Sequence, residues 1–356
     1  MKKTLIAFGA ALVCMGAAQA QSTVQLSGLV DMYAGSMKLA GKDRVSELGS
    51  GGMTTSWWGV NGTEDLGGGL KANFALGAFF RADTGDSGRF GISGGTGSET
   101  FFARDANVSL EGGFGSVKLG RSMAPNFLPT ILFNPYGDSF TVSPLVLHAN
   151  MATNFANDYK TTASDTGWSN QITYSTPSFG GVKANIHYQF GEQTTKTSAS
   201  NVGVNVLYFG GPLALTAFYE KAEMLSNPTP APYAAGTSNT NWMLGGSYNF
   251  GAAKLYATYG ASEKEILDRK KLDQTTYSVG LDLPVTKAGT VKLAYAHTET
   301  DLVTGKDTKR QTASFGYDHF LSKRTDAYAV AMYDKDDRFT ANKSGTSLAV
   351  GVRHRF

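Results

Sequence analysis

The chain has 356 residues, with 32 basic and 29 acidic side chains, and this near balance shows no clustered basic charge of the kind that nucleic-acid binding requires. One cysteine, Cys14, excludes an internal disulfide. Glycine (43), tyrosine (16) and phenylalanine (21) are abundant, and beyond the first residues no apolar run approaches the about 20 residues of a transmembrane helix.

The first residues have the pattern of a secretory signal. Two lysines precede the apolar run 5–13, and Ala18-Gln19-Ala20 supplies the small residues that a signal peptidase recognises. We therefore expect residues 1–20 to be a cleaved signal peptide and residues 21–356 to form one exported domain. A lipoprotein signal acylated at Cys14 is the alternative, but the residue before this cysteine is not small.

The exported part alternates with a period of two residues. In the last segment Leu348, Val350 and Val352 share one face, and the residues between them are small or charged. The segments 277–283 and 291–296 repeat the pattern, with apolar and aromatic residues on one face. Runs of about 9–12 such residues have the length at which a tilted strand crosses a bilayer. The pattern predicts an all-β protein.

The connections between these runs alternate between short and long. Short turns are predicted at 64–71, 111–118, 177–183, 209–213, 249–254, 283–292 and 321–326. Longer polar loops are predicted near 37–53, 82–99, 122–166, 191–200, 221–239, 261–273, 299–309 and 334–344. Fifteen connections join 16 antiparallel strands, with both termini on the short-turn side, as in bacterial outer-membrane barrels. A barrel of this size encloses a water-filled lumen.

Several segments resemble the general porins of β-proteobacteria, the Gram-negative trimeric porin family. They are 24–31, 62–72, 114–121, 175–179, 321–328 and 350–356. The resemblance implies a homotrimeric outer-membrane channel through which ions and small hydrophilic solutes diffuse, with no enzymatic activity, cofactor or metal. It also implies that the C-terminal aromatic residue, Phe356, is offered to the barrel-assembly machinery, and that outer-membrane lipids and lipopolysaccharide surround the barrel.

In this family the third external loop folds into the pore, and the sequence singles out the same loop. The stretch 122–166 is the longest connection and holds four of the ten prolines, Pro125, Pro129, Pro135 and Pro144. Long loops without regular structure are usually functional, and proline lowers the entropy cost of holding a loop in place. The alternative is a long surface loop that shields the mouth of the barrel.

The resemblance also assigns charges to the constriction. Arg121 and Arg104 match arginines of the pore wall, and Arg81 and Lys118 are further candidates for a positive wall. Alternation alone places Lys118 inward and leaves the phase of Arg121 open.

Asp138 is the acidic residue expected on the loop, although a solvated turn residue would look the same. Trp57 and Gly167 stand where the family carries arginine, so the resemblance implies weak ion selectivity of either sign.

Other functions find less support. The Gly-x-Ser-x-Gly pattern at 91–95 lies in a glycine-rich loop rather than between a strand and a helix. The histidines show no metal-ligand spacing, and Asp334, Asp336 and Asp337 lack the rest of a calcium loop, although they could share a divalent ion with lipopolysaccharide. A solute-specific channel, in which aromatic residues line a solute path, stays open because of Trp57 and Trp58. An outer-membrane barrel enzyme or an adhesin is less favoured.

Overall fold

The structure is a computed structural model that describes residues 22–89, 100–149, 166–192, 200–224, 237–266, 269–302 and 305–356. The expected signal peptide and the pattern at 91–95 lie outside these residues. Within the described ranges, no helix is long and apolar enough to cross a membrane.

The described residues form strands and two short helices. The strands of the first half are β1 (Thr23–Met37), β2 (Val45–Ser50), β3 (Trp57–Gly67), β4 (Leu70–Phe79), β5 (Asp105–Gly112), β6 (Gly115–Met123), β7 (Gly167–Ser175) and β8 (Val182–Gln189). Those of the second half are β9 (Asn201–Gly210), β10 (Leu213–Met224), β11 (Thr237–Asn249), β12 (Lys254–Ile266), β13 (Arg269–Pro284), β14 (Gly289–Leu302), β15 (Thr308–Phe320), β16 (Thr325–Asp336) and β17 (Ser344–Arg355). The helices α2 (Phe127–Leu132) and α3 (Pro144–His148) lie between β6 and β7.

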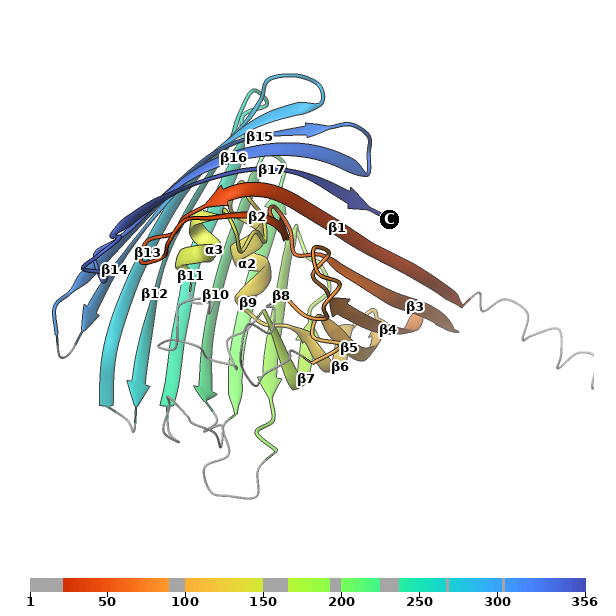
Figure 1. The fold of residues 1–356 in the computed structure, drawn as a ribbon. Coiled ribbons are helices and arrows are strands. Elements are labelled where there is room, and N and C mark those ends of the chain that lie inside the picture. The colour runs from red at the N-terminus through yellow and green to blue at the C-terminus, as the bar shows by residue number, and fades with distance from the viewer. Residues whose placement is uncertain are drawn as a thin grey trace, which may run out of the picture.

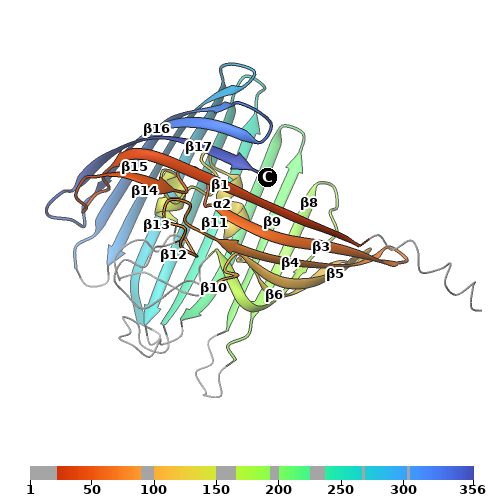
Figure 2. The same ribbon diagram turned by 45° about the vertical axis from the view of Figure 1, so that its right-hand side comes forward.

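The strands close into one antiparallel barrel. From β3 to β17 each strand pairs with the next along the chain, and β1 closes the sheet by pairing with β17. The C-terminal half of β1 pairs with β2 and its N-terminal half pairs with β3. β2 and β3 are therefore two parts of one barrel strand, which is interrupted at 51–56. The 17 strand segments thus make the predicted 16-stranded barrel, which Figures 1 and 2 show from two sides. Because β1 pairs with β17, neither end of the sheet is left as an open edge, as a membrane requires.

The seven predicted short turns all join consecutive strands and are confirmed. In the turn between β3 and β4, three successive glycines, Gly67, Gly68 and Gly69, have φ values of 83°, 62° and 81°. Other residues rarely adopt such angles, which is why this turn is glycine-rich.

The predicted long loops are partly wrong, because strands continue into them. β2 lies within the predicted loop 37–53, and β12 and β13 take up nearly all of 261–273. The strands continue to pair beyond the apolar band, where their outward residues become polar. A prediction that reads polar residues as loop therefore ends the strands too early. Strand lengths therefore range from 6 to 16 residues instead of 9–12.

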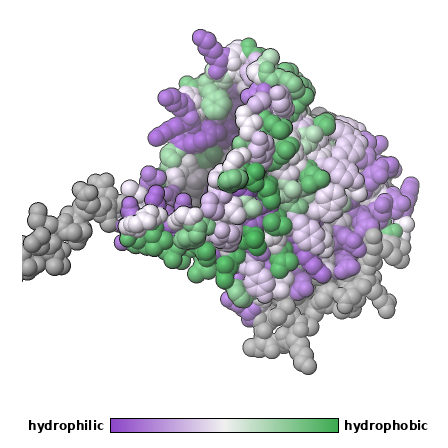
Figure 3. Space-filling view, turned by 180° about the vertical axis from the view of Figure 1, so that it is seen from behind, coloured by the Kyte–Doolittle hydropathy of each residue, from purple (hydrophilic) through white to green (hydrophobic). Residues whose placement is uncertain are grey.

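The outward face of the barrel is apolar. In β17, Leu348 and Val350 are 55% and 59% exposed, whereas Ala349 and Arg353 between and beyond them are 5% and 8% exposed. The phase predicted for this strand is confirmed. Figure 3 shows apolar side chains gathered over the barrel wall. The buried apolar cluster lies inside the barrel, between the wall and the loop that carries α2 and α3, and consists of Tyr33, Met53, Tyr136, Val142, Leu147, Tyr328, Val330, Met332 and Ala349.

Candidate functional site

Residues 124–149, called here the inner loop, lie inside the barrel, as Figures 1 and 2 show for α2 and α3. The helix α3 starts where the sequence provides for it. The Ser143 side chain accepts a hydrogen bond from the N–H of Val146, and Pro144 occupies the first helical turn. Most of the inner loop is buried against the wall, including Pro129 of α2. The alternative of a surface loop is therefore wrong for these residues.

The start of the inner loop is fixed to β9 and β10. Asn205 Nδ2 donates to the carbonyl oxygen of Pro125 at 2.8 Å, and Asn126 Nδ2 donates to Glu220 Oε1 at 2.8 Å. The ring of Pro125 lies directly over Gly203, where an added Cβ would come within 2.4 Å of the ring. The inner loop therefore enters the lumen along the wall.

The middle of the inner loop is fixed to the interruption between β2 and β3. Ser139 Oγ donates to the Gly52 carbonyl at 2.7 Å, and Thr141 Oγ1 donates to the Gly51 carbonyl at 2.8 Å. Asp31 of β1 holds the interruption itself, because its Oδ2 accepts from the N–H groups of Met53 and Thr54, both at 2.8 Å. The break in the barrel strand thus supplies the acceptors that the loop needs.

The far part of the inner loop is fixed to β14 and β15. Lys292 Nζ donates to the Pro135 carbonyl at 3.1 Å, and Ser314 Oγ donates to the Val142 carbonyl at 2.7 Å. The Nδ1 and Nε2 atoms of His148 lie 2.8 and 2.7 Å from the hydroxyls of Thr298 and Thr312. Burial, together with nearby cations, lowers the pKa of His148 well below its usual value, so the ring bridges the two hydroxyls in its neutral form.

Two of the predicted wall residues contact each other. The guanidinium of Arg104 lies over the ring of Trp57, 3.9 Å from its centroid, and forms an ion pair with Asp105. Trp57 pairs with the buried Leu29 of β1 on the inward side, whereas the next residue, Trp58, contacts Phe101 on the outside of the barrel.

Arg121 lies at an irregularity in β6. The pairing of β6 with β7 shifts register between Gly120 and Ser122, which explains why alternation left the phase of Arg121 open. Its side chain donates to the Ala103 carbonyl and, at 3.0 Å, to Ser169 Oγ. Gly167 lies beside this side chain: an added Cβ would be 3.5 Å from Arg121 Nη2 and 3.2 Å from the Ser122 carbonyl oxygen.

The other two candidate cations lie at different levels of the wall. Arg81 follows β4 and forms an ion pair with Asp83 at 2.7 Å. Together with Phe140 and Thr141 of the inner loop it lines a cavity of about 110 Å³. Lys118 is half-buried on the inward face of β6, opposite Ser109 and Thr173.

Asp138 lies on the inner loop and faces the wall. Burial raises the pKa of its carboxyl group to about 6, against a hydrogen bond from Thr54 and the positive charges of Arg353 and Arg104. Thr54 also accepts a hydrogen bond from Arg353 Nη1 at 2.7 Å. One threonine at the strand interruption thus joins the loop acid to a cation of the last strand.

Several charged residues on the inward faces of the last strands were not among the predicted site residues. Arg353, Lys292 and Arg310 form ion pairs with Asp326 (3.0 Å), Asp282 (3.1 Å) and Asp334 (3.0 Å). The alternation of the final segment places Arg353 on the face opposite Leu348 and Val350, and this is the signal in the sequence that identifies it as inward-facing.

Asp334 and Asp336 pair with Arg310 and Arg338 and are buried, so they do not face a lipid rim. No group of three or more His, Cys, Asp or Glu side chains that could hold a metal occurs in the described part of the chain.

Of the remaining assigned residues, Pro125 and Pro135 contact the wall and Pro129 is buried in α2. Phe356 pairs with Gly28 of β1 through two backbone hydrogen bonds of 3.0 and 3.2 Å. A closed barrel with an apolar outside, a polar lumen and a loop held within it defines an outer-membrane diffusion channel.

Comparisons with known proteins give the same class. The Gram-negative porin family matches residues 7–338. The chain is 34% identical to outer membrane porin protein 32 of Delftia acidovorans and 28% identical to an outer membrane porin protein of Bordetella pertussis, over the full length of each. The anion-selective porin from Comamonas acidovorans is 31% identical, with a TM-score of 0.78, over 94% of this chain and 100% of that one. The trimer form of OmpT from Vibrio cholerae is 16% identical, with a TM-score of 0.68, over 94% and 99%, and shares the fold.

The chain therefore belongs to the Gram-negative porin family, as the resemblance predicted. It is a passive channel of the bacterial outer membrane.

Proposed function

We propose that the inner loop and the charged wall form a weakly ion-selective constriction, through which ions and small hydrophilic solutes diffuse without chemical change. The observation that supports this is the pairing of charges. Arg104, Arg81, Lys292 and Arg353 each have an aspartate within ion-pair distance, so opposite charges lie side by side. Such pairs leave a small net field, since each attraction of about 1 kcal/mol at 4 Å in water is offset by a repulsion nearby.

The reversal potential of the refolded protein in a planar bilayer tests this proposal. With a tenfold KCl gradient, we expect permeability ratios within about fivefold of unity, because the fields nearly cancel. The neighbour named as anion-selective makes anion preference the direction to examine first. A permeability ratio far above tenfold in either direction would overturn weak selectivity, and the absence of conducting openings would overturn the channel itself.

A paired control separates net charge from structure. Arg104→Gln alone removes one positive charge and should shift the permeability ratio toward cations. Arg104→Gln combined with Asp105→Asn removes the whole ion pair and should return the ratio close to that of the parent protein.

The two tryptophans that kept a solute-specific channel open present little aromatic surface to the lumen. The guanidinium of Arg104 covers one face of the Trp57 ring, and Trp58 is turned to the outside. This arrangement favours a general diffusion channel over a solute-specific one. Because the family and the relatives are porins, we infer that this chain likewise catalyses no reaction.

We further propose that the functional unit is a homotrimer, because one side of the barrel is short. β5 has 8 residues, which span roughly 26 Å along the strand and about 19 Å across a membrane at a 45° tilt, less than the apolar band of about 25 Å. β13 has 16 residues. Other copies of the chain would cover the short side. Mass measurement of the detergent-solubilised protein should give three chains per particle, and a monomer that conducts normally would contradict the trimer.

A further inference from the structure

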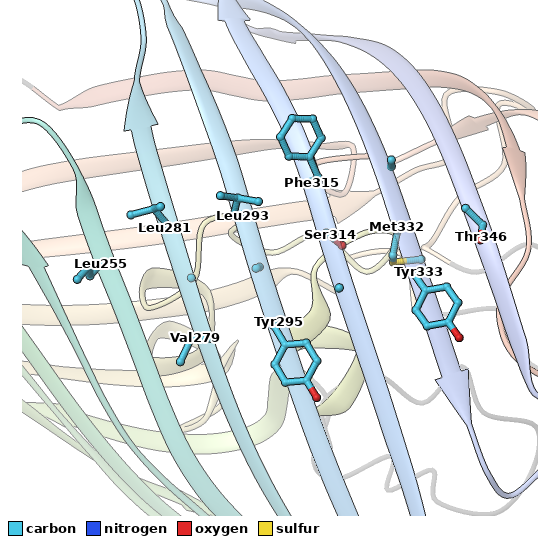
Figure 4. Close-up of a pocket in the computed structure, with 14 residues that line it drawn as sticks. Leu255, Val279, Leu281, Leu293, Tyr295, Ser314, Phe315, Met332, Tyr333 and Thr346 are labelled. Atoms are coloured by element: carbon cyan, nitrogen blue, oxygen red, sulfur yellow. The ribbon is translucent and has the colours of Figure 1, made fainter.

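The outward face of β12–β17 carries a hollow of about 600 Å³ that the channel function does not use. Figure 4 shows its rim, in which Leu293, Phe315, Tyr295 and Tyr333 stand around a floor of small residues. The volume lies within the range of about 300–1,000 Å³ that is usual for ligand pockets. A second hollow of about 430 Å³ adjoins it, since Phe315 and Ala331 line both.

The register of the strands produces this shape. Ala313 of β15 lies between Tyr295 of β14 and Tyr333 of β16, and Ala331 of β16 lies opposite Phe315. A methyl group between two rings leaves a depression, so an alkyl chain lying there would contact side chains on three sides. On an evenly covered wall it would have contacts on one side only, and dispersion attraction grows with the number of contacts.

A polar row begins immediately beyond the hollow on the long-loop side. Two residues along each strand from Tyr295, Ala313 and Tyr333, toward the long loops, the same face of the barrel carries His297, Gln311 and Lys335. Lys309 lies two residues beyond Gln311. The side chains of Lys309 and Lys335 are 57% and 45% exposed. Each contacts one carboxylate, Glu299 at 2.7 Å and Asp337 at 4.0 Å, and an ammonium group has three donors, so each can also bind a phosphate oxygen.

We propose that this hollow binds one acyl chain of lipopolysaccharide, with the phosphorylated sugar of the same molecule over Lys309 and Lys335. The assignment rests on two features. The hollow is continuous with the apolar band that faces the outer membrane, and the lysines lie at its external end, where a lipid of the external leaflet carries its anionic group. It rests on the outer-membrane location and is independent of the proposed ion selectivity.

The test measures lipopolysaccharide retained by the full-length porin after extraction from outer membranes and detergent washing, by native mass spectrometry. We expect one retained molecule per chain in the parent protein. Ala313→Phe fills the floor of the hollow and should lower retention at least fivefold. Ala217→Phe is the matched control, because Ala217 faces outward on β10, outside the hollow, and this variant should retain as much as the parent.

A second pair of variants addresses the headgroup and the possibility that Ala313→Phe does not fold. Lys309→Gln with Lys335→Gln should lower retention of lipopolysaccharide, whereas Lys323→Gln on the short-turn side should not. Equal retention in all variants, retention of phospholipid in place of lipopolysaccharide, or cross-links from position 313 to a second copy of the chain would each overturn the proposal. Conductance recorded from the same preparations reports separately on the channel, and we expect it to be unchanged in all four variants.

Discussion

At the residue scale, we expect Asp138 to make the constriction respond to pH. Burial raises the pKa of its carboxyl group from 3.8 to about 6, so the group is charged at pH 7 and mostly neutral at pH 5. A raised pKa also means that the folded protein holds the proton more tightly than the unfolded chain. The contribution of this residue to folding stability therefore falls as the pH rises from about 4 to about 6.

We expect the ratio of cation to anion permeability to fall about two- to fivefold between pH 7 and pH 5, because a negative charge in the constriction is lost. Asp138→Asn should give the pH 5 ratio at pH 7, and its ratio should change little with pH. Reversal potentials measured across this range check the prediction. A parent-like pH dependence in the Asn variant would assign the titration to another group.

At the level of elements, the interruption between β2 and β3 holds the middle of the inner loop, which is called its tip below. Ser139 and Thr141 donate to carbonyls that a continuous barrel strand would have used in its own ladder. A broken strand is costly in a membrane unless each freed group finds a partner. Here Asp31, Ser56 and the loop side chains provide the partners.

Removing both loop donors should loosen the tip without unfolding the barrel. Each hydrogen bond contributes about 1 kcal/mol, and the strand ladders, which carry most of the stability, stay intact. Ser139→Ala with Thr141→Val should raise the frequency of brief closures in single-channel records several-fold. The thermal unfolding temperature should change little. Ser322→Ala, in a short turn, is the control, and identical closure rates in all three proteins would show that these bonds do not hold the tip.

The sequence predicted the elements better than the site. Alternation and glycine-rich turns are local, so strand phase and the seven short turns followed directly, as at Leu348–Val350 and Gly67–Gly69. Strand ends were misplaced where outward residues become polar, as in β12 and β13. The contact between Arg104 and Trp57 depends on register across three strands, which no local pattern contains. The bulge at Arg121 likewise breaks the alternation that the prediction relied on.

At the scale of the whole molecule, the barrel depends on one seam between the first and last strands. The C-terminal Phe356 exchanges two backbone hydrogen bonds with Gly28, and its ring lies over the glycine. A Cβ at Gly28 would come within 2.4 Å of that ring and 2.8 Å of the Trp57 carbonyl. The ring would have to leave its place over the glycine, and the backbone carbonyl of β3 cannot move without disturbing the sheet.

Gly28→Ala should therefore weaken closure of the barrel. We expect the folded form to unfold at a temperature several degrees lower in gel-shift assays, since overpacking costs about 1–3 kcal/mol. Gly246→Ala is the matched control, because its Cβ would meet the end of the Leu215 side chain at 3.2 Å, which can give way. Phe356→Ala removes the ring and should make the added cost of Gly28→Ala smaller, because only the Trp57 contact remains. Equal effects of Gly28→Ala with and without the ring would place the strain at Trp57 alone, and stability equal to the parent would show that the seam tolerates a side chain at this position.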